Sequence, residues 1–412
     1  MFDFDGSAYS AQGIPLLDVA ERRGLPLYVY DAETIARQYA RLAAAFAGSP
    51  LRIKYAAKAL TNLAVLRLMR RLGAGLDTVS IGEVEIALRA GFEPSQIIFT
   101  PNGVSFDELR AAVERGAMVN VDSLSALERF GHAFGGRVPC CVRINPHVLA
   151  GGNPHIQTGH IDSKFGVSIY QLRHLLRIVS TYGIDVAGLH MHTGSEILDA
   201  GVFLEAAEIL YDAARQFPAL RFLDFGSGFK VQYREDQPAT DVEALGRALG
   251  ESFARFREEC GRELELWFEP GKFLVSEAGL LLARANVVKQ TVSTVFVGLD
   301  TGLNHLIRPM LYNAYHRIVN LSNPRGTPRV YSVVGYICET DTFAWDRQLP
   351  EVREGDVLAF LNAGAYGFEM SSNYNSRPRP AEVLIENGRD RLVRRRETLD
   401  DLLRTQLEAE EE

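Results

Sequence analysis

One pattern, repeated eight times between residues 52 and 271, constrains the fold of this chain more than any other feature. Each repeat begins with a short apolar run, continues through polar or glycine residues and is followed by a segment long enough for a helix. Such an alternation predicts parallel strands joined by crossover helices. The eight predicted strands are 52–59, 75–80, 96–101, 118–123, 139–145, 186–192, 221–228 and 265–271.

Eight strand–helix units favour a (β/α)₈ TIM barrel. A doubly wound parallel sheet is the alternative, because the number of strands alone does not separate the two folds. The stretch from Gly151 to Pro154 is expected to form a loop near the mouth of the barrel. The predicted helices between the strands include 62–72, 81–90, 106–115 and 202–215.

The pattern changes after about residue 280, which predicts a second domain rich in strands. At 412 residues the chain is long enough for two domains. We expect a polar loop over 230–240 and a charged helix over 397–412. The strand-like runs of the second domain, with turn signals between them, are 281–288, 294–299, 329–334, 357–361 and 381–386.

Charge and composition argue against several classes of protein. The net charge of −8 opposes binding to nucleic acid or to an anionic membrane. No apolar stretch approaches the ~18 residues of a membrane span, and the N-terminus lacks the pattern of a secretion signal. The four cysteines form neither a disulfide framework nor a zinc motif. We therefore expect a soluble cytoplasmic protein without a metal site.

Polar residues stand where the predicted barrel strands end. In a TIM barrel the carboxyl ends of the strands form the functional face, and this many polar residues on one face are hard to explain by stability. The residues at these ends are Lys58, Asp77, Asn102, Asp122, Arg143, His192, the stretch 226–228 and Glu269.

Two of these strand ends carry side chains that are reactive or able to stack. A desolvated Lys58 would have a lowered pKa and could attack a carbonyl carbon, although a lysine at the surface is the simpler explanation of this residue alone. His190 and His192 stand two residues apart and could share a metal, but no third ligand lies nearby in the sequence. An imidazole can instead stack on a flat cofactor ring, and either histidine alone could be an ordinary core residue.

Two glycine-containing loops could bind phosphate through backbone N–H groups. One is the stretch 226–228, and the other follows Glu269, whose carboxylate could hydrogen-bond a protonated ring nitrogen. An ordinary turn and a surface glutamate are the alternatives. In the second domain, Cys338 and Arg308 could likewise be an inert thiol and an exposed ion-pairing residue.

Taken together, these groups are those that pyridoxal phosphate requires. Their order resembles that of the fold-type III pyridoxal phosphate-dependent decarboxylases, in particular the branch that acts on diaminopimelate. The resemblance covers essentially the whole chain. Its most specific parts are 55–58, 192–195, 269–271, 338–339 and 370–378.

This resemblance implies an N-terminal TIM barrel over residues 28–275. It also implies an alanine racemase-like β-barrel or sandwich domain formed by residues 276–412 together with residues 1–27. The family works as a head-to-tail homodimer with its active sites at the interface.

Transferred position by position, the resemblance makes Lys58 the residue that binds the cofactor covalently and His192 the residue stacked on its ring. Glu269 becomes the partner of the ring nitrogen. Cys338 and Glu339 enter from the other subunit, with Cys338 as the proton donor to the carbon that loses carbon dioxide. The remaining cofactor contacts that it implies are Ser195, Gly226, Gly228, Gly271 and Tyr366.

The expected substrate follows from the same comparison. Lys272, Arg308 and Tyr312 stand at the positions that contact a distal carboxylate in the family, and Glu339 and Tyr366 complete the substrate site. Two cations and a phenol suit meso-2,6-diaminopimelate, whereas ornithine and arginine carry no carboxylate at that end. The implied reaction is decarboxylation at the D-centre to give L-lysine, the last step of lysine biosynthesis.

The chain departs from the family pattern at two positions. Lys272 replaces the usual arginine, which keeps the charge but loses the bidentate fork, and Ser227 interrupts a glycine triplet. One alternative is therefore a related decarboxylase that acts on another carboxylate-bearing amino acid. A homologue that binds the cofactor without turnover is less favoured, because Lys58 and Cys338 are both present.

Overall fold

A computed structural model describes residues 2–148 and 163–410, and it divides into two compact units. The first, called the barrel unit below, comprises Gln38–Gln232 and Pro238–Phe273. The second, called the sheet unit, comprises Met1–Arg37, Tyr233–Gln237 and Leu274–Glu412. The loop expected at 151–154 lies outside the described residues.

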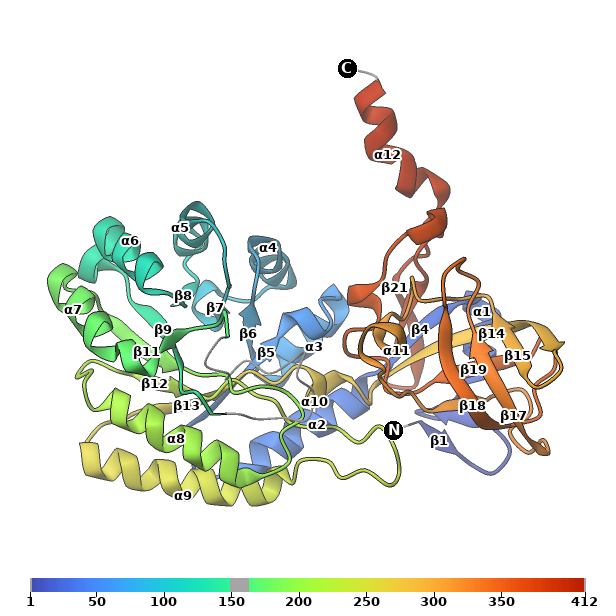
Figure 1. The fold of residues 1–412 in the computed structure, drawn as a ribbon, viewed down its shortest axis with the longest axis horizontal. Helices are drawn as coiled ribbons and strands as arrows, with labels where there is room; N and C mark the ends of the chain where they lie inside the picture. The colour runs from blue at the N-terminus through green and yellow to red at the C-terminus, as the bar shows by residue number, and fades with distance from the viewer. Residues whose placement is uncertain (1, 149–162, 411–412) are drawn as a thin grey trace. The chain divides into compact units, whose positions relative to one another are not determined.

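Eight parallel strands close into a ring in the barrel unit, which confirms the TIM barrel and excludes the doubly wound sheet (Figure 1). The pairing of β13 with β5 and of β8 with β9 closes the ring, and the short β10 (Val167–Ser168) pairs with β9 outside it. All eight predicted strands are confirmed. The ring consists of β5 (Leu51–Ala56), β6 (Gly75–Thr78), β7 (Ile97–Phe99), β8 (Met118–Val121), β9 (Cys140–Asn145), β11 (Val186–His190), β12 (Phe222–Asp224) and β13 (Glu265–Phe268).

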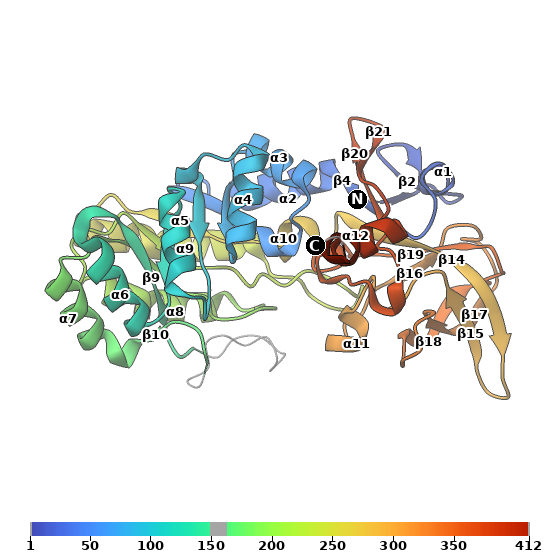
Figure 2. The same cartoon turned by 90° about the horizontal axis from the view of Figure 1, so that it is seen from above.

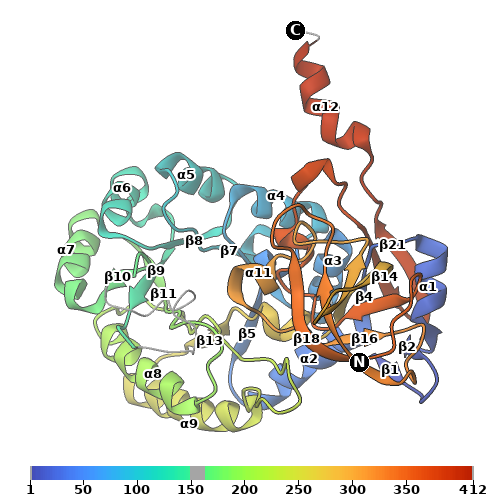
Figure 3. The ribbon, with the colours of Figure 1, turned by 45° about the vertical axis from the view of Figure 1, so that its right-hand side comes forward.

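Helices follow one another around the outside of this ring (Figure 3). Local capping explains where they start and stop: Asn62 accepts a hydrogen bond from the N–H of Ala64, and the same helix ends at Gly73 in a left-handed conformation. The four helices predicted from the sequence are confirmed. The helices of the barrel unit include α3 (Leu63–Leu72), α4 (Ile81–Ala90), α5 (Phe106–Glu114), α6 (Leu124–Phe134), α7 (Leu172–Tyr182), α8 (Ala200–Ala214) and α9 (Val242–Cys260).

An apolar cluster from five barrel strands fills part of the barrel interior. The ring of Phe222 stacks on that of Trp267, with centroids 3.6 Å apart and an interplanar angle of 6°. Gly188 makes this possible, because a Cβ there would lie 2.1 Å from the Phe222 ring. The ammonium of Lys54 also lies over the Trp267 ring, 4.2 Å from its centroid. The barrel is therefore packed at this level rather than open as a pore.

The sheet unit is built around a long, bent strand, β14 (Gly279–Gln290), which pairs with three other strands. Figure 2 shows β14 beside its antiparallel neighbour β15. The strand order is β18-β17-β15-β14-β4-β20-β21, with β19 joining β14 to β16. The strands are β4 (Leu27–Asp31), β15 (Val295–Leu299), β16 (Ile318–Asn320), β17 (Pro328–Val334), β18 (Thr342–Pro350), β19 (Val357–Phe360), β20 (Ala381–Glu386) and β21 (Arg389–Arg394).

Smaller elements complete the two units. A three-stranded sheet and a helix from the N-terminus belong to the sheet unit, and a charged helix ends the chain, as predicted over 397–412. No helix in the described part of the chain combines the length and the apolar character that crossing a membrane requires. These elements are β1 (Asp3–Phe4), β2 (Tyr9–Ala11), β3 (Ile14–Pro15), α1 (Leu16–Arg23), α2 (Ala32–Ala45), α10 (Lys272–Val275), α11 (Arg308–Tyr312) and α12 (Leu399–Glu410).

The N-terminal segment is part of the sheet unit. Its strand β4 lies between β14 and β20, and its side chains enter one apolar core with those of both strands. The domain boundary expected at residue 28 therefore falls within β4, and the compact units instead divide at Arg37 and at Phe273. The reason is that β4 is a short, wholly buried strand whose sequence does not indicate which sheet it joins.

Candidate active site

Lys58 and Asp77 form an ion pair at the carboxyl ends of neighbouring strands. Lys58 lies in a single 3₁₀ turn directly after β5, and its Nζ is 3.1 Å from Oδ2 of Asp77, near the end of β6. The Lys58 side chain remains 42% exposed, whereas the Asp77 carboxyl is fully buried. Burial and the nearby Glu269 raise the pKa of Asp77, and the Lys58 ammonium opposes them. The pair holds a primary amine in one place while leaving it accessible.

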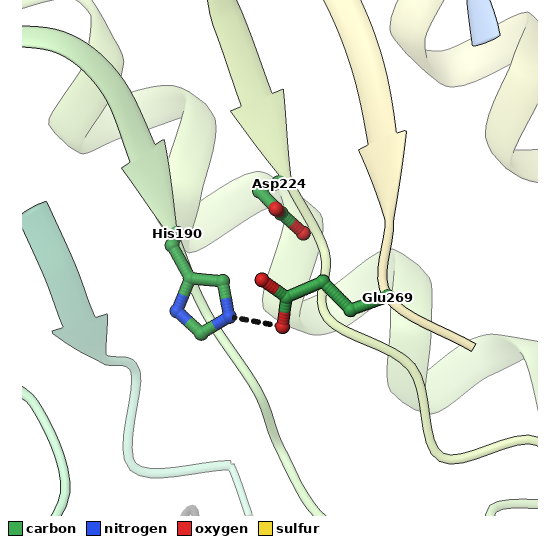
Figure 4. A group of neighbouring side chains, drawn as sticks. All are labelled: His190, Asp224 and Glu269. Atoms are coloured by element: carbon green, nitrogen blue, oxygen red, sulfur yellow. Dashed lines mark hydrogen bonds and ion pairs between the residues drawn. The ribbon is translucent and has the colours of Figure 1, made fainter. Parts of the chain in front are cut away.

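Three further titratable side chains meet where β11, β12 and β13 end (Figure 4). Nε2 of His190 lies 3.1 Å from Oε2 of Glu269, and both residues are buried. Asp224 is fully buried beside them, and its Oδ1 accepts a hydrogen bond from the N–H of Gly226. Figure 4 shows the three side chains pointing toward one another. Glu269 is thus held within the barrel rather than on the surface.

His192 lies two residues beyond His190, in the loop after β11, and is partly exposed. Desolvation of the partly buried imidazole, with the cations of Arg143 and Lys58 nearby, keeps its pKa well below the ordinary value. Its Nδ1 accepts a hydrogen bond of 3.2 Å from the N–H of Ser227, as a neutral ring can. The result is a flat, uncharged ring at the mouth of the barrel.

The glycines of the 226–228 stretch allow two loops to touch through their backbones. A Cβ on Gly228 would lie 2.3 Å from the carbonyl oxygen of Gly194, and one on Gly226 would lie 2.6 Å from Nδ1 of His192. Both glycines also have positive φ angles, +61° and +118° in chain order. Ser227, the departure from the family triplet, turns its Oγ back to accept from the N–H of Gly228 at 2.6 Å.

Lys272 is already paired within the barrel unit. Its Nζ lies 3.3 Å from Oε1 of Glu196, and its side chain is 13% exposed. Gly271, directly before it, approaches the turn that carries Lys58: a Cβ there would lie 3.0 Å from Cβ of Ala59. Other strand-end residues also pair with each other, since Nδ2 of Asn102 donates to Asp122.

Arg308 begins the short helix α11 of the sheet unit and is 5% exposed. Its guanidinium carbon lies 5.4 Å from the centre of the Tyr233 ring, which belongs to the same unit. Within the described residues, no carboxylate forms an ion pair with Arg308, and its Nε has no hydrogen-bond partner. A buried cation without a counter-charge is costly unless a ligand supplies one.

Cys338 and Glu339 lie on an exposed loop of the sheet unit, beside the 370–378 segment. Nδ2 of Asn375 is 3.2 Å from Sγ of Cys338, and the hydroxyl of Tyr374 donates to Oε1 of Glu339 at 2.9 Å. Two of the most specific parts of the sequence resemblance are therefore in contact with each other. Tyr366, in the same unit, has a φ of +57°, a conformation that is unusual for a bulky residue.

The predicted site residues thus gather in two groups. Lys58, His192 and Glu269 lie at the strand ends of the barrel unit, and the sheet unit holds Cys338 beside Glu339. The sequence analysis did not identify Asp77 as the partner of Lys58, nor His190 and Asp224 as neighbours of Glu269. The strand-end pattern gave the place of Asp77 but not its pairing, and it missed His190 and Asp224, because the predicted strands 186–192 and 221–228 extend beyond the observed ends of β11 and β12.

The barrel residues suit pyridoxal phosphate. The loops 226–228 and 192–195 are in backbone contact and leave no room for extra side chains, as a phosphate cradle requires. Lys58 offers an accessible amine, and Glu269 offers a buried carboxylate for a ring nitrogen. The same cluster of His190, Asp224 and Glu269 has ligand atoms within 4.8 Å of one another, so the expected absence of a metal remains a prediction.

Comparisons with known proteins agree with this geometry. Residues 32–276 match the model of the pyridoxal binding domain of pyridoxal-dependent decarboxylases. The chain is 42% identical to the diaminopimelate decarboxylase of Methanothermobacter thermautotrophicus, over 96% of this chain and 94% of that protein. It is 40% identical to the Pseudomonas aeruginosa enzyme of the same name, over 97% of each. The structure of diaminopimelate decarboxylase from M. jannaschii in complex with L-lysine matches with a TM-score of 0.90 and 31% identity, covering 98% of this chain and 97% of that one.

Proposed function

We propose a function from one premise: this chain belongs to the diaminopimelate decarboxylases, a group within the pyridoxal-dependent decarboxylase family. It releases carbon dioxide from the D-configured carbon of meso-2,6-diaminopimelate and leaves L-lysine, the last step of lysine biosynthesis. Its cofactor is pyridoxal 5'-phosphate. The reaction rests on likeness over nearly the whole chain, and the structural observation that carries the choice of substrate is the buried guanidinium of Arg308.

Arg308 distinguishes a substrate with a distal carboxylate from one without it. A diaminopimelate carboxylate would give this guanidinium the counter-charge that no described residue supplies as an ion pair. Ornithine or arginine would leave the cation buried and unpaired. The site should therefore bind these two amino acids more weakly than diaminopimelate. Tyr312, one helical turn after Arg308, would add a hydroxyl, and Glu339 would pair with the distal ammonium. Lys272 contributes less, because Glu196 already holds it.

The barrel residues would hold the cofactor and control its protonation. When bound, pyridoxal phosphate supplies an electron sink for the electron pair that remains when the bond to the carboxylate breaks. Lys58 would hold it covalently through Nζ, and His192 would lie against its ring. Glu269, as a carboxylate, would stabilise a proton on the ring nitrogen. The remaining contacts proposed for the cofactor are Ser195, Gly226, Gly228, Gly271 and Tyr366.

Cys338 completes the reaction by donating a proton from Sγ to the carbon that has lost carbon dioxide. Cys338 lies exposed on a loop, beside Asn375. This exposure supports a role in which its thiol reaches a group of another subunit. We place this thiol in the active site of the partner subunit, so the working form is a homodimer. We also place the protein in the cytoplasm, in agreement with the four cysteines, which are all free thiols.

The test offers the purified, cofactor-loaded protein five substrates: meso-, LL- and DD-diaminopimelate, ornithine and arginine. Carbon dioxide and lysine are both measured. We expect lysine from the meso isomer alone, in an amount equal to the carbon dioxide released.

Release of carbon dioxide from another amino acid instead would refute diaminopimelate as the substrate and keep the family. A yellow, cofactor-loaded protein that is inert on all five would refute the proposed reaction, and Lys272 would be the first residue to examine.

A further inference from the structure

The cluster of His190, Asp224 and Glu269 contains two neighbouring buried carboxyl groups and one imidazole (Figure 4). Asp224 is completely buried, and Glu269 and His190 are 7% and 1% exposed. Two carboxylates this close in a dry interior repel each other strongly, so the pair holds a proton. The question is which of the two carboxyl groups carries it.

Hydrogen bonds around the cluster answer this question. Both oxygens of Glu269 face a donor: Oε2 faces Nε2 of His190 at 3.1 Å, and Oε1 faces the hydroxyl of Thr100 at 3.3 Å. Asp224 has a donor only at Oδ1, from the N–H of Gly226 at 2.8 Å. Its Oδ2 is buried, and no donor among the described residues reaches it. A bare carboxylate oxygen there would be unsatisfied, whereas a protonated one can donate to Glu269.

We propose that Asp224 is a neutral carboxylic acid that donates from Oδ2 to Glu269, and that His190 and Asp224 together hold Glu269 as the ionised member of the pair. Both are positioning residues that act through Glu269. The proposal rests on the proposed function only in assigning Glu269 to the ring nitrogen of the cofactor.

The surrounding charges support this assignment. Burial and the charge of Glu269 raise the pKa of Asp224 well above its ordinary value. Burial acts in the same direction on Glu269, but His190 and Lys58 outweigh it and lower the pKa of Glu269. The titratable or charged groups that face the cluster from the other strands and loops are Lys54, Lys58, Asp77, Cys141, Arg143 and His192.

The arrangement has a chemical purpose under the proposed function. A neighbouring carboxyl group favours the protonated form of a ring nitrogen when that carboxyl group is an anion. A second carboxyl group in the same pocket could take that negative charge itself. By keeping the proton on Asp224, the cluster leaves the charge on Glu269, which the proposed function places against the cofactor.

The first test observes the proton directly. Infrared spectra of the full chain, with aspartate carboxyls labelled by ¹³C, are compared for the wild type and Asp224→Asn, with and without cofactor. We expect a carboxylic-acid C=O band near neutral pH that Asp224→Asn removes and that the surface control Asp107→Asn leaves in place. A band unaffected by Asp224→Asn, or no such band, overturns the proposal.

The second test follows stability against pH in the cofactor-free full chain. In the unfolded chain Asp224 ionises near its ordinary pKa of 3.8, while in the folded chain it keeps its proton to higher pH. The unfolded state then binds fewer protons, so stability falls as pH rises. Relative to Asp224→Asn, the wild-type folding constant should fall about tenfold per pH unit above pH ~5. A pH-independent difference between the two proteins contradicts a neutral Asp224.

The third test separates the hydrogen bond of His190 from its shape. His190→Gln keeps an N–H donor near Glu269, and His190→Leu removes it. We expect His190→Leu to weaken cofactor binding about tenfold and to shift the pH at which the bound cofactor changes its absorbance. His190→Gln should recover most of both. Equal losses in the two variants would mean that His190 only fills space.

These measurements remain informative if the proposed reaction is wrong. The infrared and stability tests need neither substrate nor turnover, so a failure of diaminopimelate decarboxylation leaves them standing. A bound metal ion, at one per chain and lost with Asp224→Asn, would require both carboxyl groups to be ionised and would refute the neutral Asp224.

Discussion

In the barrel unit, Asp77, Asp224 and Glu269 are buried at the ends of parallel strands, whereas Cys338 and Glu339 in the sheet unit lie on an exposed loop. The barrel carboxyls change each other's pKa values, because little water screens them. The loop residues Cys338 and Glu339 lie at the surface, where water screens them, and contact Asn375 and Tyr374. Substitutions in the barrel cluster should therefore affect several groups at once, and substitutions on the loop should have separate effects.

The largest effect is expected at Lys58, the solvent-accessible partner of the buried Asp77 in the barrel unit. Lys58→Ala should lower turnover by about a thousandfold or more, the scale seen when a covalent nucleophile is lost. It should also change the pH response of the bound cofactor, because Asp77 loses its ion-pair partner. Turnover and cofactor absorbance are measured together, with exposed Lys289→Ala as the control. Substantial turnover in Lys58→Ala would remove this residue from its central role.

Substitution of Cys338 should show the opposite behaviour: turnover should fall strongly, while binding of the cofactor should not change. Cys338→Ala should slow turnover by about a hundredfold, as loss of a general acid does, while cofactor affinity stays unchanged. Cys260→Ala, at the end of α9, is the matched control. If Cys338→Ala loses cofactor, the thiol has a structural role and the contrast between the two units fails.

Mixing the two impaired variants tests whether Cys338 serves the partner subunit. Co-refolded Lys58→Ala and Cys338→Ala chains should regain activity, because each mixed dimer contains one intact site beside one site that lacks both residues. Each variant refolded alone supplies the baseline. Mixtures that stay at this baseline, despite dimer formation by sedimentation, would place both residues in the same subunit's site.

Arg308 combines features of both units, since it lies in the sheet unit but is buried. Arg308→Ala should raise KM for diaminopimelate about tenfold or more, in line with about 1.5–3 kcal/mol for a hydrogen bond to a charged group. Turnover at saturation and cofactor affinity should change little. Arg308→Lys should recover part of the loss, and exposed Arg329→Ala should have no effect. An unchanged KM would contradict the distal-carboxylate role.

Lys272 should show the smallest effect. Because Glu196 already shares its charge, we expect Lys272→Met to raise KM no more than about threefold. Stability measurements on Lys272→Met, Glu196→Gln and the double variant should give a coupling energy of about 1 kcal/mol. A KM effect equal to that of Arg308→Ala, with no coupling, would mean that Lys272 contacts the substrate directly.

The sequence predicted the barrel more completely than the sheet unit, for a physical reason. Barrel strands are buried on both faces, so each appears as a continuous apolar run followed by a helix, and all eight could be recognised. In the sheet unit, the charged edge strand β21 and the partly exposed β18 lack such runs. The short β4 and β16 have the right composition, but only the tertiary pairing shows that they are strands.

The functional residues follow the same division. Lys58 and Glu269 could be placed from the sequence, because strand ends define one face of a barrel. The two histidines could not be told apart by spacing: His190 ends β11 and turns to Glu269, whereas His192 lies in the loop and contacts Ser227. The contact between Cys338 and Asn375 joins residues distant in sequence, and only folding reveals it.

The stack of Phe222 on Trp267 also limits how this sequence can diverge. Gly188 cannot gain a side chain while the Phe222 ring occupies the space of its Cβ. A smaller residue at 222 would uncover one face of Trp267, the ring over which the buried ammonium of Lys54 lies while it donates to the carbonyl of Gln96. A substitution at Gly188, Phe222, Trp267 or Lys54 therefore disturbs the contacts of the other three, and we expect a compensating change among them to be needed.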